Sequence, residues 1–425
     1  MSILTDPDTA VETPQHRLAR AKEASRSIAR LTSGEKERAL EAIARTIEEN
    51  ASRIISANAT DIARGRENGI GEALIDRLSL DEKRVAALAS AVRDVAALPD
   101  PIGQVLGGHR MPNGVALEQV RVPFGVVGAI YEARPNVTVD IAALALRAGN
   151  AVVLRGGSAA LDSNTVLVEL MRSALKGAGV DPEAVQSVDD FGRDGAKAMM
   201  HGRGFIDVLV PRGSAALIET VVTESTVPVI ETGAGVVHIV LDESAPAEWA
   251  RDIVVNAKVQ RPSVCNAVET VLVLREAAPT LVPVVVGALQ DQGVSVHGDD
   301  TVAGLVSDVI PATEEDWSTE YLSLDVSMKV VDTLDDALAH IRRYSTGHTE
   351  SIITTDSRNA ERFLAEVDSA VVMANASTRF TDGAEFGFGA EVGISTQKLH
   401  TRGPMGVSEL TSTKWLARGT GQTRG

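Results

Sequence analysis

The only cysteine of the chain, Cys265, is the first candidate for chemistry. Lys258 and Arg261 precede it closely, and nearby cations lower the pKa of a thiol. The adjacent Asn266 can offer a polar donor, and Pro262-Ser263 favours a loop. A thiolate on such a loop suits covalent catalysis at a carbonyl carbon. The alternative from the residues alone is a buried cysteine that packs as a small apolar side chain.

Glu231 is the second candidate. It follows the apolar run 227–230 and precedes the glycine-rich stretch 232–235. An acid at the end of a strand and before a glycine turn can act as a catalytic base. It can equally cap the next element, and the residues alone leave both roles open.

Composition and missing motifs exclude several classes of function. The 425 residues hold 41 basic and 58 acidic side chains, a net charge of −17, and only 3% aromatic residues, which argues against nucleic-acid binding. One cysteine excludes an intrachain disulfide and any cysteine-based metal site. The chain has no Gly-Lys of a P-loop, no Gly-x-Ser-x-Gly and no His-Glu-x-x-His. We predict no metal site, and we expect 348–350 (His-Thr-Glu) to be a surface turn.

Targeting and membrane segments are not evident. Residues 1–20 carry charges and lack the apolar centre of a signal peptide. The most apolar stretch, 277–289, is shorter than the roughly 20 residues of a membrane helix, and two prolines interrupt it. We therefore expect a soluble, cytoplasmic protein.

The first hundred residues predict helices. Leu40, Ile43 and Ile47 recur near the helical period, and Ser33 is the expected N-cap of that helix. Further amphipathic helices are expected over 53–66 and 81–98.

After residue 120, short β-branched runs alternate with helical stretches, which is typical of parallel sheets in successive α/β domains. The expected strands are 125–131, 151–154, 205–210, 227–230, 236–241, 269–274, 329–331, 351–354 and 370–374. The expected helices are 139–148, 163–176, 333–344 and 358–367.

Several long sequence segments that contain or flank these candidates resemble those of a known family. The chain resembles the aldehyde dehydrogenase superfamily, and within it the family of gamma-glutamyl phosphate reductases, over nearly its whole length after about residue 15. The strings that carry the resemblance are Gly125–Ile130, Tyr131–Thr138, Leu154–Ser158, Gln260–Asn266, His340–Glu350, Asn375–Phe380 and Arg402–Gly406.

The resemblance implies an α/β aldehyde-dehydrogenase-like fold with two Rossmann-like parallel-sheet domains and a small oligomerisation hairpin. It implies an NADP-binding domain over 1–107 and 121–230 and a catalytic domain over 231–375. The oligomerisation element is expected over 108–120 and 395–425. A homodimer or homotetramer is expected.

The implied reaction is the second step of proline biosynthesis. NADPH reduces L-glutamyl 5-phosphate to L-glutamate 5-semialdehyde, which cyclises to pyrroline-5-carboxylate, and phosphate is released. Cys265 would form the thioester, and the Asn136 amide would stabilise the oxyanion. Glu231 matches the general base of the superfamily, and we expect it to contribute modestly because a reductase must avoid thioester hydrolysis. Glutamate 5-kinase is a plausible transient partner.

Binding residues follow from the same resemblance. Arg155 and Ser158 match positions that meet the adenosine ribose, and an arginine there suits the 2′-phosphate of NADP(H). Arg212-Gly213-Ser214 matches the turn that holds the pyrophosphate. Glu320 matches the residue that fixes the nicotinamide ribose. The candidate cations for the substrate, of which two are expected to touch it, are Arg134, Lys258, Arg261 and Arg379.

Two rival functions remain open. One is a non-phosphorylating aldehyde dehydrogenase that oxidises a small acidic aldehyde. The other is a catalytically silent redox sensor in which Cys265 is an oxidisable thiol. His238, within the expected strand 236–241, is interpreted as structural.

Overall fold

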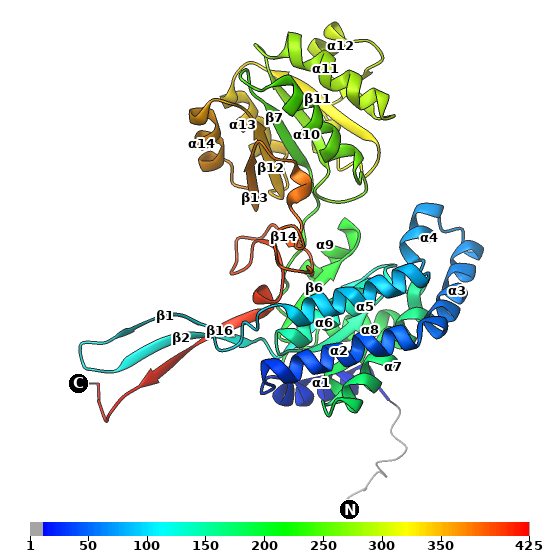
Figure 1. The fold of residues 1–425 in the computed structure, drawn as a ribbon, viewed down its shortest axis with the longest axis vertical. Helices are drawn as coiled ribbons and strands as arrows, with labels where there is room; N and C mark the ends of the chain where they lie inside the picture. The colour runs from blue at the N-terminus through cyan, green and yellow to red at the C-terminus, as the bar shows by residue number, and fades with distance from the viewer. Residues whose placement is uncertain (1–11, 425) are drawn as a thin grey trace, which may run out of the picture. The chain divides into compact units, whose positions relative to one another are not determined.

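The computed structural model describes residues 12–424, so the parts of the expected domains that fall on 1–11 and on residue 425 lie outside the described residues. The chain forms two compact units. The first contains Met1–Glu231, Phe388–Gly393 and Met405–Gly425, and the second contains Thr232–Gly387 and Ile394–Pro404. Each unit is an α/β structure built on a parallel sheet (Figure 1).

The first unit has a four-stranded parallel sheet in the order β5-β4-β3-β6. Its strands are almost fully apolar and buried, as expected for a sheet covered on both faces. They are β3 (Val126–Tyr131), β4 (Ala151–Arg155), β5 (Val185–Ser187) and β6 (Val208–Arg212).

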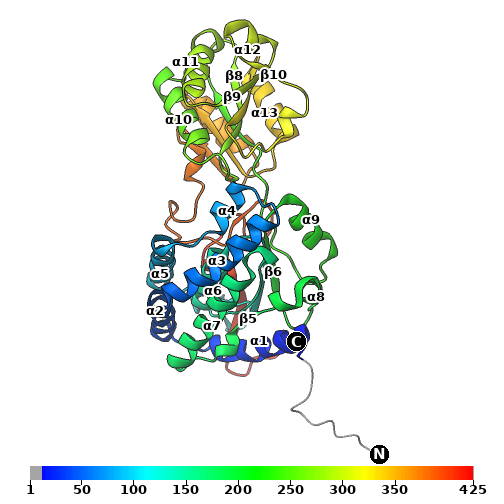
Figure 2. The same ribbon diagram turned by 90° about the vertical axis from the view of Figure 1, so that its right-hand side faces the viewer.

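Helices cover this sheet in two layers. Helices α6 and α7 pack together near the sheet, and α2, α3 and α5 pack outside them (Figure 2). The α-helices of the unit are α1 (Pro14–Ile28), α2 (Ser33–Glu49), α3 (Ala51–Glu67), α4 (Glu72–Leu78), α5 (Glu82–Ala97), α6 (Pro135–Arg147), α7 (Leu161–Gly177), α8 (Gly192–Met200) and α9 (Ala215–Glu224). Its 3-10 turns are η1 (Ser158–Ala160), η2 (Pro182–Ala184), η3 (Asp189–Phe191) and η6 (Ser408–Leu410).

A three-stranded antiparallel sheet, β1-β2-β16, belongs to the same unit and extends away from its helices (Figure 1). We call it the arm. The hairpin expected near 109–120 is present, and Gly114, at φ 91°, closes its turn by donating its N–H to the Met111 carbonyl at 2.8 Å. The strands are β1 (Val105–Arg110), β2 (Ala116–Pro123) and β16 (Thr411–Arg418).

The second unit has a seven-stranded parallel sheet in the order β10-β9-β11-β8-β7-β12-β13. Helices α10 and α11 cover one face, and α13 and α14 cover the other. The strands are β7 (Val237–Leu241), β8 (Val268–Leu274), β9 (Ser295–Gly298), β10 (Ile310–Pro311), β11 (Asp325–Val331), β12 (Thr349–Ile353) and β13 (Val371–Ala374).

The remaining elements of the second unit connect these strands. A small antiparallel pair, β14 (Ile394–Ser395) and β15 (Gly403–Pro404), lies near the C-terminal end of the unit. The helices are α10 (Ala247–Val259), α11 (Ala278–Asp291), α12 (Asp300–Leu305), α13 (Leu334–Tyr344) and α14 (Ser357–Glu366), with 3-10 turns η4 (Asp316–Ser318) and η5 (Thr378–Phe380). Among the described residues, no helix is long and apolar enough to cross a membrane.

Three local expectations are wrong. Thr32, not Ser33, is the N-cap of α2, because Thr32 and Glu35 form a capping box. The run 227–230 is not a strand; Val229 makes a single bridge to Leu209. Residues 348–350 are not a surface turn, because they are fully buried at the start of β12. Glu350 is satisfied there by His238, whose backbone N–H lies 2.7 Å from its carboxylate.

A buried asparagine should dominate the stability of the helical layer. Asn58 on α3 is 1% exposed; its amide donates to the Leu78 carbonyl at 2.8 Å and accepts the Leu80 N–H at 2.7 Å. Asn58→Ala leaves both backbone groups unpaired, so we expect unfolding free energy to fall by about 2–4 kcal/mol in urea titrations. The exposed Asn68→Ala is the control and should cost less than about 1 kcal/mol. Equal losses in the two variants would contradict the assignment.

Candidate active site

Cys265 lies on a turn that leads into β8, at the amino edge of the seven-stranded sheet. The Ala267 N–H donates to the Val264 carbonyl at 3.1 Å and closes this turn. Cys265 is partly exposed, so it is not the buried apolar cysteine of the alternative interpretation. Gly235 precedes β7 and the Glu320–Leu322 turn precedes β11, so both segments reach the same edge. In a parallel sheet, all amino ends lie along one edge.

Gly235 fixes the backbone at Cys265. A Cβ at Gly235 would overlap the Cys265 carbonyl oxygen and lie 2.9 Å from the Cys265 Cα. Glycine is required here by close approach of two backbones. The position of the Gly235 segment therefore determines where the thiol can sit.

Glu320 holds that segment. Its Oε1 accepts the Gly235 N–H at 2.7 Å. Two residues on, Leu322 has φ 55°, a left-handed conformation that non-glycine residues adopt at an energetic cost. Glu320 belongs to this turn, and burial raises the pKa of its carboxyl.

Arg379 ties the two ends of the cysteine loop. Its Nε donates to Gln260 Oε1 at 2.7 Å, and its Nη1 donates to Asn266 Oδ1. Asn266 in turn donates its Nδ2 to the Thr381 carbonyl at 2.7 Å, and its carbonyl accepts the Thr378 hydroxyl at 2.8 Å. Asn266, expected as a polar donor near the thiol, thus holds the loop. Arg379, expected at the substrate, is a clamp of the same loop in this structure.

Lys258 has no exposed side-chain surface, and its Nζ donates to Glu269 Oε2 at 2.6 Å. Burial lowers the pKa of Lys258 and raises the pKa of Glu269 to about 7. A lysine in this position does not present its ammonium to a substrate, so the expectation that Lys258 binds substrate is not kept. Arg261, by contrast, is exposed at the start of the cysteine loop.

The candidates of the first unit lie at the carboxyl edge of its sheet. After β3, Ala133 has φ 40° and turns the chain into α6, with Arg134 as its N-cap residue. Asn136, in the first turn, donates its Nδ2 to Asp140 Oδ2 at 3.0 Å. Burial raises the pKa of Asp140 to about 6, while Asn136 and the charge of Arg212 oppose that shift.

The end of β4 suits an anionic ligand. The Nε of Arg155 is buried, and no described residue accepts a hydrogen bond from it. Asp189 Oδ1 is likewise buried without a partner, so a water or a ligand at this strand end could satisfy both atoms. Burial raises the pKa of the nearby Asp189 carboxyl to about 6, and the charge of Arg155 opposes that shift. Ser158, three residues on, is exposed.

The end of β6 leads into α9 through Arg212-Gly213-Ser214. Ser214 is the N-cap of α9, and its backbone N–H donates to Glu132 Oε2 at 2.9 Å. A Cβ at Gly213 would lie 2.6 Å from the same oxygen, so glycine permits this approach. A carboxylate thus occupies the end of the helix that favours anions. Sequence reasoning missed Glu132.

Glu231 lies at the boundary between the units and is partly buried. The chain leaves the first unit at this residue, and the Thr232–Gly235 stretch begins the second. Among the described residues, no strand lies immediately before Glu231, so the expectation that this acid follows a strand is wrong.

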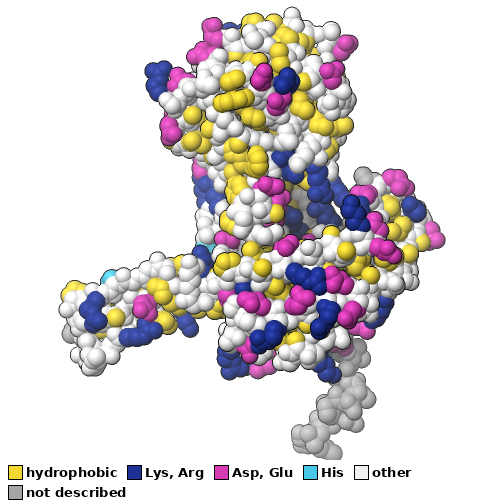
Figure 3. All heavy atoms as spheres, in the orientation of Figure 1, with side chains coloured by type: hydrophobic (Ala, Val, Ile, Leu, Met, Phe, Trp, Pro, Cys, Tyr) yellow, Lys and Arg dark blue, Asp and Glu magenta, His cyan; other side chains and the backbone are white. Residues whose placement is uncertain are grey.

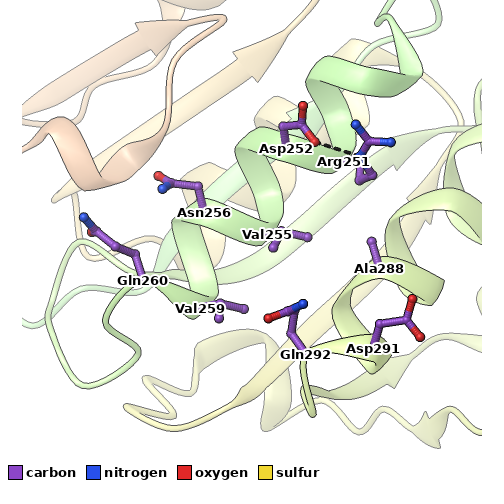
Figure 4. Close-up of a pocket in the computed structure, with 9 residues that line it drawn as sticks. All are labelled: Arg251, Asp252, Val255, Asn256, Val259, Gln260, Ala288, Asp291 and Gln292. Carbon is purple, nitrogen blue, oxygen red and sulfur yellow. Dashed lines mark hydrogen bonds and ion pairs between the residues drawn. The ribbon is translucent and has the colours of Figure 1, made fainter.

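A surface hollow of about 520 Å³ lies between α10 and α11 (Figure 4). It is lined by amide, charged and small apolar side chains, and Arg251 pairs with Asp252 at its rim. None of these residues is a candidate nucleophile, and only Gln260 connects the hollow to the cysteine loop. We do not place the chemistry there.

Comparison with known protein families identifies the class to which this chain belongs. Residues 3–309 match the aldehyde dehydrogenase family. The parallel-sheet architecture and the lone cysteine before β8 agree with an oxidoreductase of this kind.

Close relatives narrow the class. A gamma-glutamyl phosphate reductase of Clavibacter michiganensis subsp. michiganensis is 64% identical over 408 residues, covering 96% of this chain and 94% of that protein. One from Leifsonia xyli subsp. xyli is 61% identical, covering 98% and 99% of the two chains. The crystal structure of the Thermotoga maritima gamma-glutamyl phosphate reductase superposes with a TM-score of 0.95 at 43% identity, covering 97% and 100%. The chain therefore belongs to the aldehyde dehydrogenase family and groups within it with the gamma-glutamyl phosphate reductases.

Asp140 should give a pH-dependent stability. Its folded pKa, about 6, lies above the ordinary aspartate value, so its contribution to stability falls as pH rises through about 4 to 6. Asp140→Asn cannot ionise and retains an oxygen for Asn136. We expect the variant to be stabilised, by on the order of 1 kcal/mol more at pH 8 than at pH 5.5, in urea unfolding.

The control for this prediction is Asp368→Asn. Lys398 and Arg402 lower the pKa of the Asp368 carboxyl, so that variant should lose stability at pH 8. A stability gain in Asp140→Asn that does not change with pH would show that ionisation of Asp140 is not the cause.

Proposed function

We propose that the protein catalyses the NADPH-dependent reduction of L-glutamyl 5-phosphate to L-glutamate 5-semialdehyde, with release of phosphate, in proline biosynthesis. The observation that carries the proposal is the single thiol, Cys265, which is partly exposed on a turn that packs against Gly235. The chain that carries it is 64% identical to a gamma-glutamyl phosphate reductase.

The first chemical step is acylation of Cys265. Its thiolate attacks the acyl carbon, the carbon–oxygen bond to the phosphoryl group breaks, and phosphate leaves. The backbone N–H of Cys265 and the Asn136 amide are proposed as donors to the oxyanion, each worth very roughly 3–4 kcal/mol. Asp140 orients the Asn136 amide by accepting one of its two N–H bonds.

The second step reduces the enzyme thioester. When bound, NADPH supplies the hydride that adds to the thioester carbon. The Cys265 sulfur then leaves as a thiolate, the carbon–sulfur bond breaks, and the aldehyde forms. Rigid attachment of the cysteine loop by Arg379 keeps the sulfur in place through both steps.

The cofactor residues proposed are those at the carboxyl edge of the first unit, together with Glu320. The orphaned Nε of Arg155 supports a role for this side chain in binding the 2′-phosphate of NADP, with Ser158 beside it. The Arg212-Gly213-Ser214 turn is proposed to take the pyrophosphate in exchange for Glu132. Glu320 is proposed to bind the nicotinamide ribose.

Two cations remain for the anionic substrate. Arg134, at the start of α6, and Arg261, exposed on the cysteine loop, are proposed to meet its carboxylate and phosphoryl groups. Of the other two candidates, Lys258 is paired with Glu269 and Arg379 bonds to the ends of the cysteine loop.

The arm supports a proposal of oligomerisation. It exposes Val105, Leu106 and Trp415 as well as Lys414 and Arg418, and Figure 3 shows apolar and basic side chains along it. A projecting sheet with such a surface suits an interface with another subunit. We propose a homodimer or homotetramer.

The acyl phosphate substrate is labile in water, so we propose a transient contact with glutamate 5-kinase. We also propose that the reaction takes place in the cytoplasm.

The reverse reaction tests the proposal. Purified protein with pyrroline-5-carboxylate should reduce NADP only when phosphate is present, because phosphate must cleave the thioester. Cys265→Ser should lower the rate about a thousandfold or more while the melting temperature stays near wild type. A phosphate-independent rate would identify an ordinary aldehyde dehydrogenase, and full activity of the serine variant would exclude the thioester.

Glu231 should matter little to the reductase. Water activation is not required when phosphate is the leaving group, so Glu231→Gln should keep kcat within about fivefold of wild type. Steady-state rates and NADPH affinity are measured together. Near-complete loss of activity with unchanged NADPH affinity would contradict this expectation.

A further inference from the structure

Lys258 lies among three acids, of which Glu269 is fully buried and Glu320 and Asp325 are partly exposed. It pairs with Glu269 at 2.6 Å, and its charge also acts on Glu320 and Asp325. Glu269 and Glu320 repel each other, which contributes to the raised pKa of Glu269. The Lys258–Glu269 pair is fully buried, so removing one partner would leave a costly unpaired charge, whereas Asp325 also has His297 at 3.1 Å.

A continuous series of contacts connects Lys258 with Cys265. Glu269 Oε1 accepts the Leu322 N–H at 3.4 Å and so supports the strained turn that carries Glu320. Glu320 accepts the Gly235 N–H at 2.7 Å, and the Gly235 backbone lies against Cys265. Along the chain, Glu269 follows Cys265 by four residues on β8.

We propose that Lys258 is a positioning residue for Cys265, which acts by holding Glu320 against Gly235. This inference rests on the proposed role of Cys265 as the nucleophile. Without the ammonium, no cation opposes the repulsion between Glu269 and Glu320, and the Glu320 carboxylate leaves the Gly235 N–H. The Gly235 segment then loses the contact that sets the Cys265 backbone.

A matched control exists in the other unit. Lys36 on α2 is equally buried, with a side chain 1% exposed, and its Nζ pairs with Asp100 at 2.8 Å. Lys36→Met removes a buried lysine–carboxylate pair that has no connection with the cysteine loop. Any effect of lost stability alone should appear in both lysine variants.

The test compares Lys258→Met, Lys258→Met/Glu269→Gln and Lys36→Met. In Lys258→Met, hydrogen exchange of a peptide containing Gly235 should accelerate about tenfold or more in the unliganded protein. Its kcat with pyrroline-5-carboxylate and phosphate should fall about tenfold or more, with KM for phosphate changing less than about threefold. Lys36→Met should lower the melting temperature and leave all three quantities near wild type.

The double variant separates positioning from stability. Removing both charges of the pair should restore the melting temperature, while Gly235 exchange stays fast and kcat stays low because the Glu320 carboxylate still lacks the ammonium of Lys258. If kcat and protection of Gly235 recover together with the melting temperature, the pair is only structural and the inference is overturned. Should Lys258→Met fail to fold, the double variant alone decides. Hydrogen exchange needs no turnover, so it tests Lys258 even if Cys265→Ser proves active.

Discussion

The contact between the Gly235 backbone and the Cys265 carbonyl is the constraint on which the site depends. No side chain fits at residue 235, so the two segments meet as bare backbones. Strands β7 and β8 are neighbours in the sheet, with Val237 opposite Val268, and this pairing brings the two preceding segments together. The register between β7 and β8 therefore determines where the Cys265 backbone, and with it the sulfur atom, lies.

The two units use opposite edges of their sheets. In the first, the proposed cofactor residues follow β4 and β6 at the carboxyl edge, where helix N-termini favour phosphates. In the second, Cys265 precedes β8 at the amino edge, just beyond the end of α10 at Val259. Cys265 is held there by the backbone contact with Gly235 and by the bonds of Arg379 to both ends of its loop.

The sequence predicted most of the fold because apolar strand runs and helical spacing are local signals. It predicted the loop at Cys265 for the same reason. It failed where tertiary contacts decide: 348–350 looks polar but is buried, since His238 and neighbouring hydroxyls satisfy Glu350. The inward direction of Lys258 had a readable signal, because it continues the stripe of Ala250 and Val254 on α10. Its partner Glu269 required knowledge of the fold.

Lys258 and Arg379 also change what the net charge of −17 implies. An acidic protein that binds an anion needs cations at the site. Lys258, by its proximity to Cys265 in the sequence, and Arg379, through the family resemblance, were both candidates to bind the ligand. In the structure, Lys258 pairs with Glu269, and Arg379 bonds to Gln260 and Asn266 at the two ends of the cysteine loop. Cations spent on internal contacts do not attract substrate, but they remove the conformational freedom that would otherwise be lost in the transition state. Order in the Cys265 loop is thus obtained from charges that composition alone would assign to binding.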